Sequence, residues 1–403
     1  MIRIGVIGGG AAGFFAALRH KELYPAHEVI IFEKTSKFLG KVRISGGGRC
    51  NVTHACFEVK KLVTYYPRGS KELMGPFHRF QPADTIKWFE ERGVELKTED
   101  DGRMFPVTDQ SQTIIDCLVK EAYRLGVKIE LKHDLLALTP IAEEQGFLLN
   151  FKDKDTKQVD KLILTTGSNE MIWKALENLG HTILPPVPSL FTFNITDPRL
   201  EAFPGISWPN VEIKPRDSKL VTHGPLLITH WGLSGPAILK MSAIGAIEWH
   251  KLDYRFIIQI NFLFPNKMTE VLDELTAYKS LNPNKLTHAT SLFSFTSRIW
   301  AGWMQLFGLA NKTWQNLSKK DLLMLSEKLT RAEFEVNGKS TFKEEFVTCG
   351  GVDLGEVDMK TMESKKVKNL YFAGEVLNID ALTGGFNFQA AWTTGWIAGE
   401  TGG

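Results

Sequence analysis

The sequence predicts an α/β fold in which a nucleotide-binding domain is interrupted by a second, β-rich domain. Three features of the 403-residue chain support this prediction: a glycine-rich loop between two apolar runs near the N-terminus, a middle part with strand-like and then helical patterns, and a strand, glycines and a helix near the C-terminus. Because one hydrophobic core seldom organises a chain of this length, we expect more than one domain.

The first feature is the segment of residues 8–13, Gly-Gly-Gly-Ala-Ala-Gly, which fits the pattern G-x-G-x-x-G. It follows the apolar run of residues 2–7, which is typical of a parallel strand buried on both faces, and it precedes a helical pattern. In such a loop Gly8 permits a tight turn, Gly10 lets the backbone approach a pyrophosphate, and Gly13 lets the helix pack close to the strand. The segment therefore predicts a dinucleotide site rather than an ordinary glycine-rich turn.

An acidic residue supports this prediction. Glu33 ends the second strand-like run, twenty residues beyond Gly13, where a carboxylate would accept hydrogen bonds from the adenosine ribose hydroxyls. An acid rather than an arginine at this position disfavours a 2′-phosphate, which leaves FAD or NAD. The glycine pattern alone does not choose between these two nucleotides.

A second glycine-rich stretch, ISGGGRCN at residues 44–51, begins eleven residues after Glu33, so no further strand–helix–strand unit fits around it. Its glycines would instead let the chain run against a flat or anionic ligand that the first loop holds. Arg49 is either a charge partner of that ligand or a member of a structural salt bridge. Cys50 is either redox active or a packed thiol.

Five segments carry a family resemblance: GGGAAG at 8–13, ISGGGRCNVT at 44–53, DGRMFP at 101–106, LLITHWGLSGPAIL at 226–239 and TMESKKVKNLYFAGEVLNIDALTGGFNFQAAWTTGWIAG at 361–399. The chain resembles the bacterial flavoproteins of the aminoacetone oxidase family, or BaiN-like NAD(P)/FAD-dependent oxidoreductases. The segments span nearly the whole chain in the family's order. The resemblance implies FAD as the cofactor. It also implies a Rossmann-like FAD-binding domain that is split by an inserted β-rich subdomain containing a helical module.

Changes of pattern along the chain place the expected domain boundaries, and a proline-rich stretch marks the first of them. We expect the FAD-binding domain to comprise residues 1–189 and 346–403. The inserted β-rich subdomain would comprise residues 190–265 and 329–345, with the helical module at residues 266–328 between its two parts.

The resemblance also implies roles for individual residues. The three-glycine segment would lie along the ribityl and isoalloxazine end of FAD, and Arg49 would stabilise the negative charge that a reduced flavin carries at N1 and C2=O. Glu375 would face the ribityl hydroxyls, and the helix near Asn387 would direct backbone N–H groups and its dipole at the flavin. The predicted cofactor-binding residues are Gly8, Gly10, Ala11, Ala12, Gly13, Glu33, Lys34, Lys41, Arg43, Gly46, Gly47, Gly48, Arg49, Cys50, Asn51, Gly167, Gly374, Glu375, Gly385, Asn387 and Phe388.

Two residues are candidates for catalysis, Arg49 and His230. His230 precedes a turn rich in glycine and proline and then a predicted helix, where it would contact a substrate or transfer a proton. The alternative is a structural histidine, which is the commoner role of a single histidine.

The composition argues against several other functions. The 48 basic and 46 acidic residues are too evenly balanced to indicate nucleic acid or an acidic membrane as a partner, so we expect neither. The four cysteines are too few for a disulfide framework and form no C-x-x-C pair, so we expect no metal and a cytoplasmic location. No apolar run approaches the roughly 20 residues that span a bilayer. A small-molecule substrate is the expected partner, and the oligomeric state stays open.

The expected function is that of an FAD-dependent oxidoreductase which transfers a hydride between flavin N5 and a small organic substrate bound between the two domains. No second G-x-G-x-x-G is present, so NAD(P)H would bind only transiently as donor, or the electrons would come from the substrate. The alternative is a flavin-binding redox sensor or scaffold without turnover, because the segment after Gly167 is shorter than in the family it resembles. A flavoprotein that modifies tRNA is a third reading, against which the near-neutral charge argues.

Overall fold

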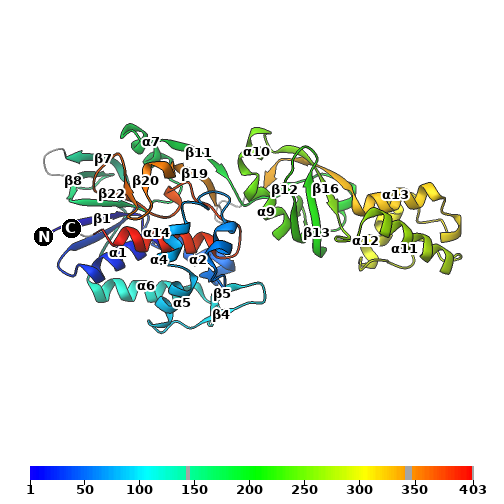
Figure 1. The fold of residues 1–403 in the computed structure, drawn as a ribbon, viewed down its shortest axis with the longest axis horizontal. Helices are drawn as coiled ribbons and strands as arrows, with labels where there is room; N and C mark the ends of the chain where they lie inside the picture. Colours follow the sequence, from blue (N-terminus) through cyan, green and yellow to red (C-terminus); the bar gives the residue numbers. More distant parts are fainter. Residues whose placement is uncertain (142–145, 341–346, 402–403) are drawn as a thin grey trace. The chain divides into compact units, whose positions relative to one another are not determined.

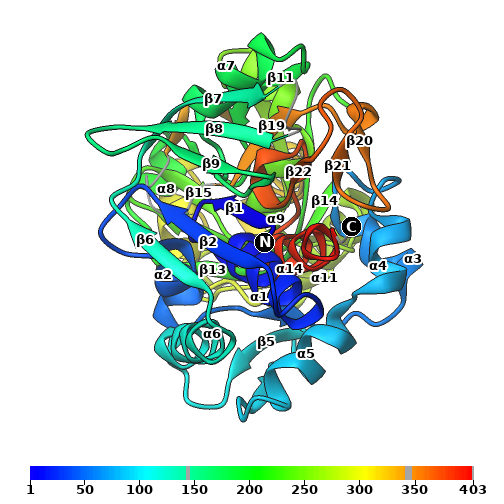
Figure 2. The same cartoon turned by 90° about the vertical axis from the view of Figure 1, so that its left-hand side faces the viewer.

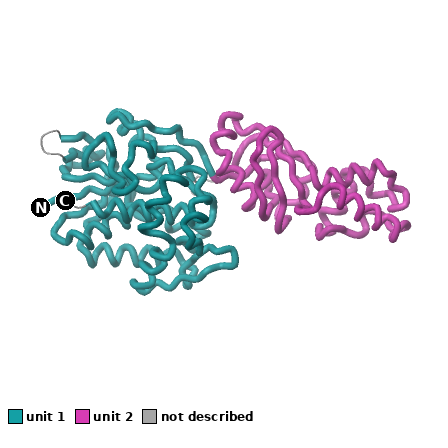
Figure 3. The backbone as a smooth tube through the Cα atoms, viewed as in Figure 1, with its two compact units in different colours: residues 1–189, 342–403 teal, residues 190–341 magenta. Residues whose placement is uncertain are grey.

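The chain forms two units in the computed structural model, which describes residues 1–141, 146–340 and 347–401. The first unit joins residues 1–189 with residues 342–403, and the second comprises residues 190–341 (Figure 3). The assignment of these units to cofactor binding and to an inserted subdomain stays a prediction.

A seven-stranded sheet forms the centre of the first unit. In order across the sheet its strands are β20 (Val357–Asp358), β21 (Glu363–Ser364), β22 (Leu370–Phe372), β10 (Lys161–Leu164), β1 (Arg3–Ile7), β2 (Glu28–Glu33) and β6 (Lys128–Leu131). The five strands from β22 to β6 are parallel to one another. Segments from the beginning, the middle and the end of the chain therefore lie side by side in one sheet (Figure 1).

Each face of this sheet is covered by a different layer. Helices α1 (Ala11–Leu23), α6 (Ser111–Leu125) and α14 (Phe386–Gly399) lie on one face, and a meander of β7 (Leu135–Ile141), β8 (Gly146–Phe151) and β9 (Lys157–Val159) lies on the other (Figure 2). Because both faces are covered, the central strands are apolar in their middle residues, and Ile4 and Val6 of β1 have no exposed surface.

Shorter elements complete the first unit. They are α2 (Gly40–Gly48), β3 (Thr53–His54), α3 (Val59–Leu62), η1 (Val63–Tyr65), α4 (Met74–Arg79), α5 (Pro82–Glu90), β4 (Leu96–Thr98), β5 (Arg103–Pro106), α7 (Glu170–Asn178), β11 (Ile183–Pro188), β19 (Thr348–Val352), η3 (Leu354–Glu356) and η4 (Gly374–Val376). Strands β3, β5 and β4 form a small antiparallel sheet, and β11 pairs with β19.

The second unit has its own sheet and its own hydrophobic core. Across the antiparallel sheet the strands are β17 (Ala332–Asn337), β16 (Arg255–Asn261), β13 (Ser207–Pro215), β14 (Thr222–Thr229), β15 (Gly232–Ser234), β12 (Thr192–Asn194) and β18 (Lys339–Ser340). Its helices are α8 (Pro198–Glu201), α9 (Pro236–Ile244), α10 (Ala246–Lys251), α11 (Met268–Leu281), α12 (Ser297–Leu306), η2 (Trp314–Asn316) and α13 (Lys319–Thr330). Three of these helices, α11 to α13, follow β16 and precede β17, so helices interrupt the strands of this sheet in sequence.

The predicted fold class, an α/β protein with a split Rossmann-like domain and an inserted β-rich part that carries helices, is confirmed. The stretch ISGGGRCN, whose secondary structure was not predicted, lies partly in a helix. Residues 40–48 form α2, a helix that is kinked at Ser45, Gly46 and Gly47.

Candidate cofactor site

The first glycine loop is a tight turn whose shape two glycines require. Gly8 has φ +108°, and a Cβ atom on it would lie 2.5 Å from the carbonyl oxygen of Thr165. A Cβ atom on Gly13 would lie 2.0 Å from the carbonyl oxygen of Gly8. Gly10 differs, because no described atom lies within 4 Å of the position its Cβ would take. The loop is thus closed on the protein side and open at Gly10, where a ligand can approach the backbone.

Helix α1 begins directly after this loop. Its N-cap is Gly10, no described side chain caps it, and its first turn contains no acidic residue. The first N–H groups of a helix have no partner within the helix, and they carry a partial positive charge. The N-terminus of α1 is therefore suited to an anion such as a pyrophosphate.

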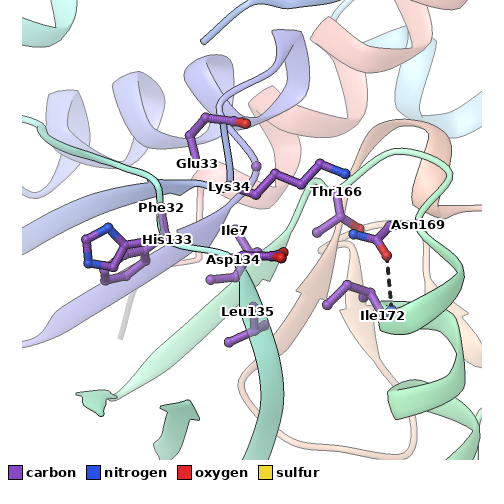
Figure 4. A pocket seen from close by; sticks show the side chains of 11 residues that line it. Ile7, Phe32, Glu33, Lys34, His133, Asp134, Leu135, Thr166, Asn169 and Ile172 are labelled. Carbon is purple, nitrogen blue, oxygen red and sulfur yellow. Dashed lines mark hydrogen bonds between the residues drawn. The ribbon is translucent and has the colours of Figure 1, made fainter. Parts of the chain in front are cut away.

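A pocket lies beside the loop, at the carboxyl ends of β1 and β2 (Figure 4). It is lined by Ile7, Gly8, Phe32, Glu33, Lys34, His133, Asp134, Leu135, Thr166, Asn169 and Ile172. Apolar side chains and charged ones thus share its wall, as a purine with an attached ribose requires. The hydroxyl of Thr166 is buried and has no hydrogen-bond partner among the described residues, which is the condition expected of a group that a ligand completes.

Glu33 is held in place by its own neighbours. Its Oε2 accepts the N–H of Gly9 at 2.9 Å, and its Oε1 accepts the N–H and the hydroxyl of Thr35, both at 2.8 Å. A carboxylate accepts about four hydrogen bonds. In this arrangement Glu33 has capacity for about one ribose hydroxyl, fewer than the sequence suggested.

The three consecutive glycines at the end of α2, Gly46 to Gly48, have two different surroundings. All have positive φ angles, and a Cβ atom on Gly46 would lie 2.9 Å from the Phe105 ring. Gly47 and Gly48 have no described atom within 4 Å of their Cβ positions. The first glycine therefore packs on the protein, and the next two leave space for a ligand.

Arg49 holds this turn in place. Its guanidinium pairs with Glu99 at 2.6 Å, lies 3.6 Å from Asp109, and covers the Phe105 ring at 3.9 Å from the ring centre. Its Nε donates to the carbonyl oxygen of Gly46 at 3.4 Å. These contacts correspond to the structural reading of Arg49, and a contact with the flavin stays a prediction.

The two residues after Arg49, Cys50 and Asn51, also make their contacts within the protein. Cys50 has no exposed surface, and burial raises the pKa of its thiol to about 12, which suits a packed thiol. With its amide oriented to satisfy its neighbours, Asn51 accepts the N–H of Gly385 at 2.9 Å and donates to the carbonyl oxygen of Thr53 at 3.0 Å. Asn51 thereby joins α2 to the loop that precedes α14.

Glu375 and Lys41 meet on the same side of the glycine loop. The Lys41 ammonium contacts the Glu375 carboxylate, and a Cβ atom on Gly167 would lie 3.7 Å from Oε2 of Glu375. Gly374, with φ +75°, donates its N–H to the hydroxyl of Thr394 at 2.9 Å. Four predicted residues, Lys41, Gly167, Gly374 and Glu375, are thus brought together.

Arg43, also predicted to bind the cofactor, lies elsewhere. Its guanidinium donates to Oε1 of Gln112 at 2.7 Å. Arg43 is therefore directed at α6 and away from Glu375, the partner of Lys41. A cofactor contact of Arg43 stays a prediction.

Helix α14 offers a second N-terminus of the same kind. It begins after Gly385, which has φ +91°, and neither a described side chain nor an acidic residue caps its first turn. The side chain of Asn387 closes the preceding loop instead, accepting the N–H of Ala381 at 2.9 Å and donating to its carbonyl at 3.1 Å. The N–H groups of Phe386, Asn387 and Phe388 are therefore available to an anionic ring edge.

The two helices run in the same direction. A Cβ atom on Gly395 or on Gly399 would lie 2.5 Å from the carbonyl oxygen of Ala12 or of Ala16, respectively, so α14 packs backbone to backbone along α1. Asn387 precedes Gly395 by eight residues, which places the start of α14 about 12 Å beyond Ala12 along the axis. Two open helix N-termini thus face the same way and are offset from each other along the helix axis. A pyrophosphate and an isoalloxazine ring that are joined by a ribityl chain require such an arrangement. The residues fit FAD.

His230, the second catalytic candidate, belongs to the other unit. It lies in the turn between β14 and β15 beside Trp231, with 6.2 Å between the ring centres. Its role stays a prediction.

Several residues near these elements were not predicted. His54 stacks on Phe386 with 4.5 Å between ring centres, and Tyr66 donates its hydroxyl to the Phe386 carbonyl at 2.6 Å. Residues 133–135, which line the pocket, were not predicted either, because only the strand order brings them next to β2. The position of His54, directly after the quoted motif ISGGGRCNVT, was the available signal for that residue.

Within residues 1–141, 146–340 and 347–401, no group of three or more His, Cys, Asp or Glu side chains could hold a metal ion. No helix in these ranges is long and apolar enough to cross a membrane. Cys50, Cys56, Cys117 and Cys349 are unpaired and buried.

Comparison with known proteins gives a family and several relatives. The model of the HI0933-like protein Rossmann domain matches residues 2–401. The chain is 29% identical over 406 residues to a ribosomal RNA dihydrouridine synthase of Escherichia coli (strain K12), covering 98% of this chain and 96% of the relative. It is 26% identical over 417 residues to a 3-dehydro-bile acid delta(4,6)-reductase of Clostridium scindens (strain ATCC 35704 / DSM 5676 / VPI 13733 / 19), covering 99% of this chain and 98% of the relative.

Among solved structures, the chain is similar to a 3-ketosteroid-delta4-(5alpha)-dehydrogenase from Rhodococcus jostii RHA1. The TM-score is 0.51 at 11% identity, with 99% of this chain and 96% of that chain covered, so the likeness concerns the fold. The name of the Escherichia coli relative stands against the expectation that nucleic acid is not a partner. That expectation rested on net charge, which does not report how charge is distributed.

Proposed function

The chain belongs to the HI0933-like Rossmann family, and we propose that it is an FAD-dependent reductase of carbon–carbon double bonds conjugated to a carbonyl group. One observation of the structure carries the cofactor in this proposal: α1 and α14 present two parallel, offset and uncapped N-termini, each preceded by glycines. This arrangement supports a ligand that is anionic at two separated points.

Different residues would bind different parts of FAD. The N-terminus of α1 would hold the pyrophosphate, Glu33 a ribose hydroxyl, and Glu375 the ribityl chain. The space beside Gly47 and Gly48 and the N-terminus of α14 would receive the isoalloxazine. When bound, FAD supplies a hydride acceptor and donor at N5. The N–H groups of α14 would stabilise the negative charge of the reduced ring.

The names of the relatives support the reaction class. Dihydrouridine is uridine with two hydrogens added across C5=C6, a bond conjugated to the C4 carbonyl. The bile-acid reductase is named for double bonds conjugated to a 3-oxo group. In uridine a hydride would add to C6, the carbon β to the carbonyl, and a proton to C5, the α carbon. In a 4,6-dien-3-one the hydride would add to the β carbon or to the δ carbon at the end of the conjugated system, and a proton to the α or γ carbon. One site can therefore serve either substrate if the pocket admits it.

We place uracil in ribosomal RNA first among the substrates and a dienone second. The RNA-modifying relative supports the first choice, and residues 190–341 carry more basic than acidic side chains although the whole chain is nearly neutral. The bile-acid reductase supports the second choice. NADH or NADPH would be the electron donor in both.

The test begins with the visible spectrum of the purified protein, followed anaerobically after NADH or NADPH is added. We expect flavin absorbance that one nucleotide bleaches, and reoxidation by an unmodified ribosomal RNA transcript with a mass gain of two hydrogens in a uridine. Reoxidation only by a 4,6-dien-3-one steroid would replace the first substrate by the second. A colourless protein that does not take up FAD would contradict the cofactor, and bleaching without reoxidation by either substrate would contradict the reaction class.

A further inference from the structure

Four polar side chains without exposed surface lie behind the first turn of α14: Gln389, Thr53, Thr85 and Thr393. Oε1 of Gln389 accepts the hydroxyl of Thr53 at 2.6 Å and that of Thr85 at 3.0 Å. Nε2 of Gln389 donates to the hydroxyl oxygen of Thr393 at 3.1 Å. The hydroxyl of Thr393 lies 2.9 Å from the carbonyl oxygen of Phe80. The cluster therefore connects α14 to β3, to α5 and to Phe80, the C-cap residue of α4.

Such a cluster needs a physical reason. Burying polar groups costs free energy that hydrogen bonds between them offset, and apolar side chains of the same shape can fill such a space with equal or greater stability. What a satisfied polar network does provide is one fixed arrangement of the elements it joins. Here the fixed element is the turn that begins at Gly385.

Further bonds hold the same turn. The hydroxyl of Tyr66, a residue that is 2% exposed, donates to the carbonyl oxygen of Phe386 at 2.6 Å. Asn51 accepts the N–H of Gly385, and Asn387 bonds to the backbone of Ala381. Side-chain hydrogen bonds thus fix residues 385, 386, 387 and 389, while no described side chain caps the free N–H groups at the N-terminus of α14.

We propose that Tyr66, Thr85 and Gln389 are positioning residues which fix the free N–H groups of α14 toward the flavin and so favour reduced over oxidised FAD. This inference rests on the proposed function. Fixed dipoles stabilise a developing charge better than mobile ones, because no free energy is spent on turning them toward it. Loosening the turn should therefore weaken binding of the anionic reduced ring more than binding of the neutral oxidised ring.

The test uses the full-length protein with bound FAD and three variants. Tyr66→Phe removes one hydroxyl from the turn, and Thr85→Val removes one bond to Gln389 with little change of shape. The control is Tyr371→Phe, since Tyr371 is likewise buried, at 5% exposed, but lies in β22 and not behind the start of α14. The measurements are the midpoint potential of the flavin, the dissociation constant for oxidised FAD, and Tm.

We expect Tyr66→Phe and Thr85→Val to lower the affinity ratio of reduced to oxidised FAD by about threefold to tenfold, which makes the potential about 14 to 30 mV more negative for a two-electron couple. Tyr371→Phe should leave the potential unchanged. Unchanged potentials in both test variants, or an equal shift in the control, would overturn the inference, and a change of Tm alone would indicate a purely structural cluster. Absence of FAD from the wild-type protein would instead overturn the proposed function.

Discussion

The side chain of Asn51 and the backbone of Gly385 are joined by a hydrogen bond of 2.9 Å. One residue belongs to the ISGGGRCN stretch and the other precedes the last helix, so the bond connects the two segments that flank the proposed flavin position. We expect Asn51→Ala to weaken FAD binding about threefold to tenfold, because the N–H of Gly385 at the start of α14 loses a hydrogen bond that contributes about 0.5–1.5 kcal/mol. Titration of the apoprotein with FAD measures this.

The matched control for this prediction is Asn378→Ala. Asn378 also accepts a glycine N–H in the first unit, that of Gly350, at 3.2 Å. Equal losses of FAD affinity in both variants would show that Asn51 has no special place in the site.

Substitutions at the first loop should separate binding from folding. Gly10→Glu should abolish FAD retention with little change of Tm, because its side chain enters open space but repels and blocks the pyrophosphate. Gly13→Ala should instead lower Tm, since its Cβ would lie 2.0 Å from the carbonyl oxygen of Gly8. The two variants are compared by flavin absorbance per protein and by thermal unfolding. A yellow Gly10→Glu protein with a full complement of FAD would refute the placement of the pyrophosphate.

Arg49 should act through its shape rather than its charge alone. Because its planar guanidinium both covers Phe105 and pairs with Glu99, Arg49→Lys should weaken FAD binding about as much as Arg49→Ala, roughly threefold to tenfold. Glu99→Gln should cause a loss in the same direction, and the combination should be less than additive. If lysine preserved the wild-type affinity and Glu99→Gln had no effect, Arg49 would be a charge partner of the flavin.

Stability should decrease in mild acid through His20. This side chain is buried between the carbonyl oxygen of Gly399 (3.1 Å) and His27 (3.0 Å), and burial, followed by His27, lowers its pKa from 6.5 to about 4. Between pH 6.5 and 4 the unfolded chain therefore binds a proton that the folded chain does not. The free energy of unfolding should fall over this range by at most about 3 kcal/mol.

Urea unfolding at several pH values measures this dependence. His20→Gln should flatten the curve below pH 6.5, whereas His78→Gln, which alters an exposed histidine, should leave it as it is. A wild-type free energy of unfolding that stayed constant from pH 6.5 to 4.5 would contradict the assignment.

Features that depend on neighbouring residues could be predicted from the sequence. The turn at Gly8, the helix after it and the position of Glu33 follow from local spacing, because strand periodicity and the need for positive φ are encoded within a few residues. The helix α14 after the C-terminal glycines was likewise predicted from its pattern.

Features that depend on tertiary partners could not be predicted. The partners of Arg49 are Glu99 and Asp109, which the small sheet of β3, β5 and β4 brings close, and nothing in the spacing of ISGGGRCN specifies them. The offset between α1 and α14 is set by the glycines and alanines of their common seam. The order of strands decides which residues line the pocket, as for Leu135.

The strand order has a consequence for the folding of the protein during its synthesis on the ribosome. Strand β10 lies between β1 and β22, and its residues Leu162, Ile163 and Leu164 have no exposed surface in the finished sheet. Until β22 is synthesised, this apolar strand is an unpaired edge, and such edges invite aggregation. Roughly 200 residues, including the whole second unit, separate the two strands, so at about 5–20 residues per second the edge stays open for about 10 to 40 s. Nascent chains of this protein should therefore need a chaperone during that interval.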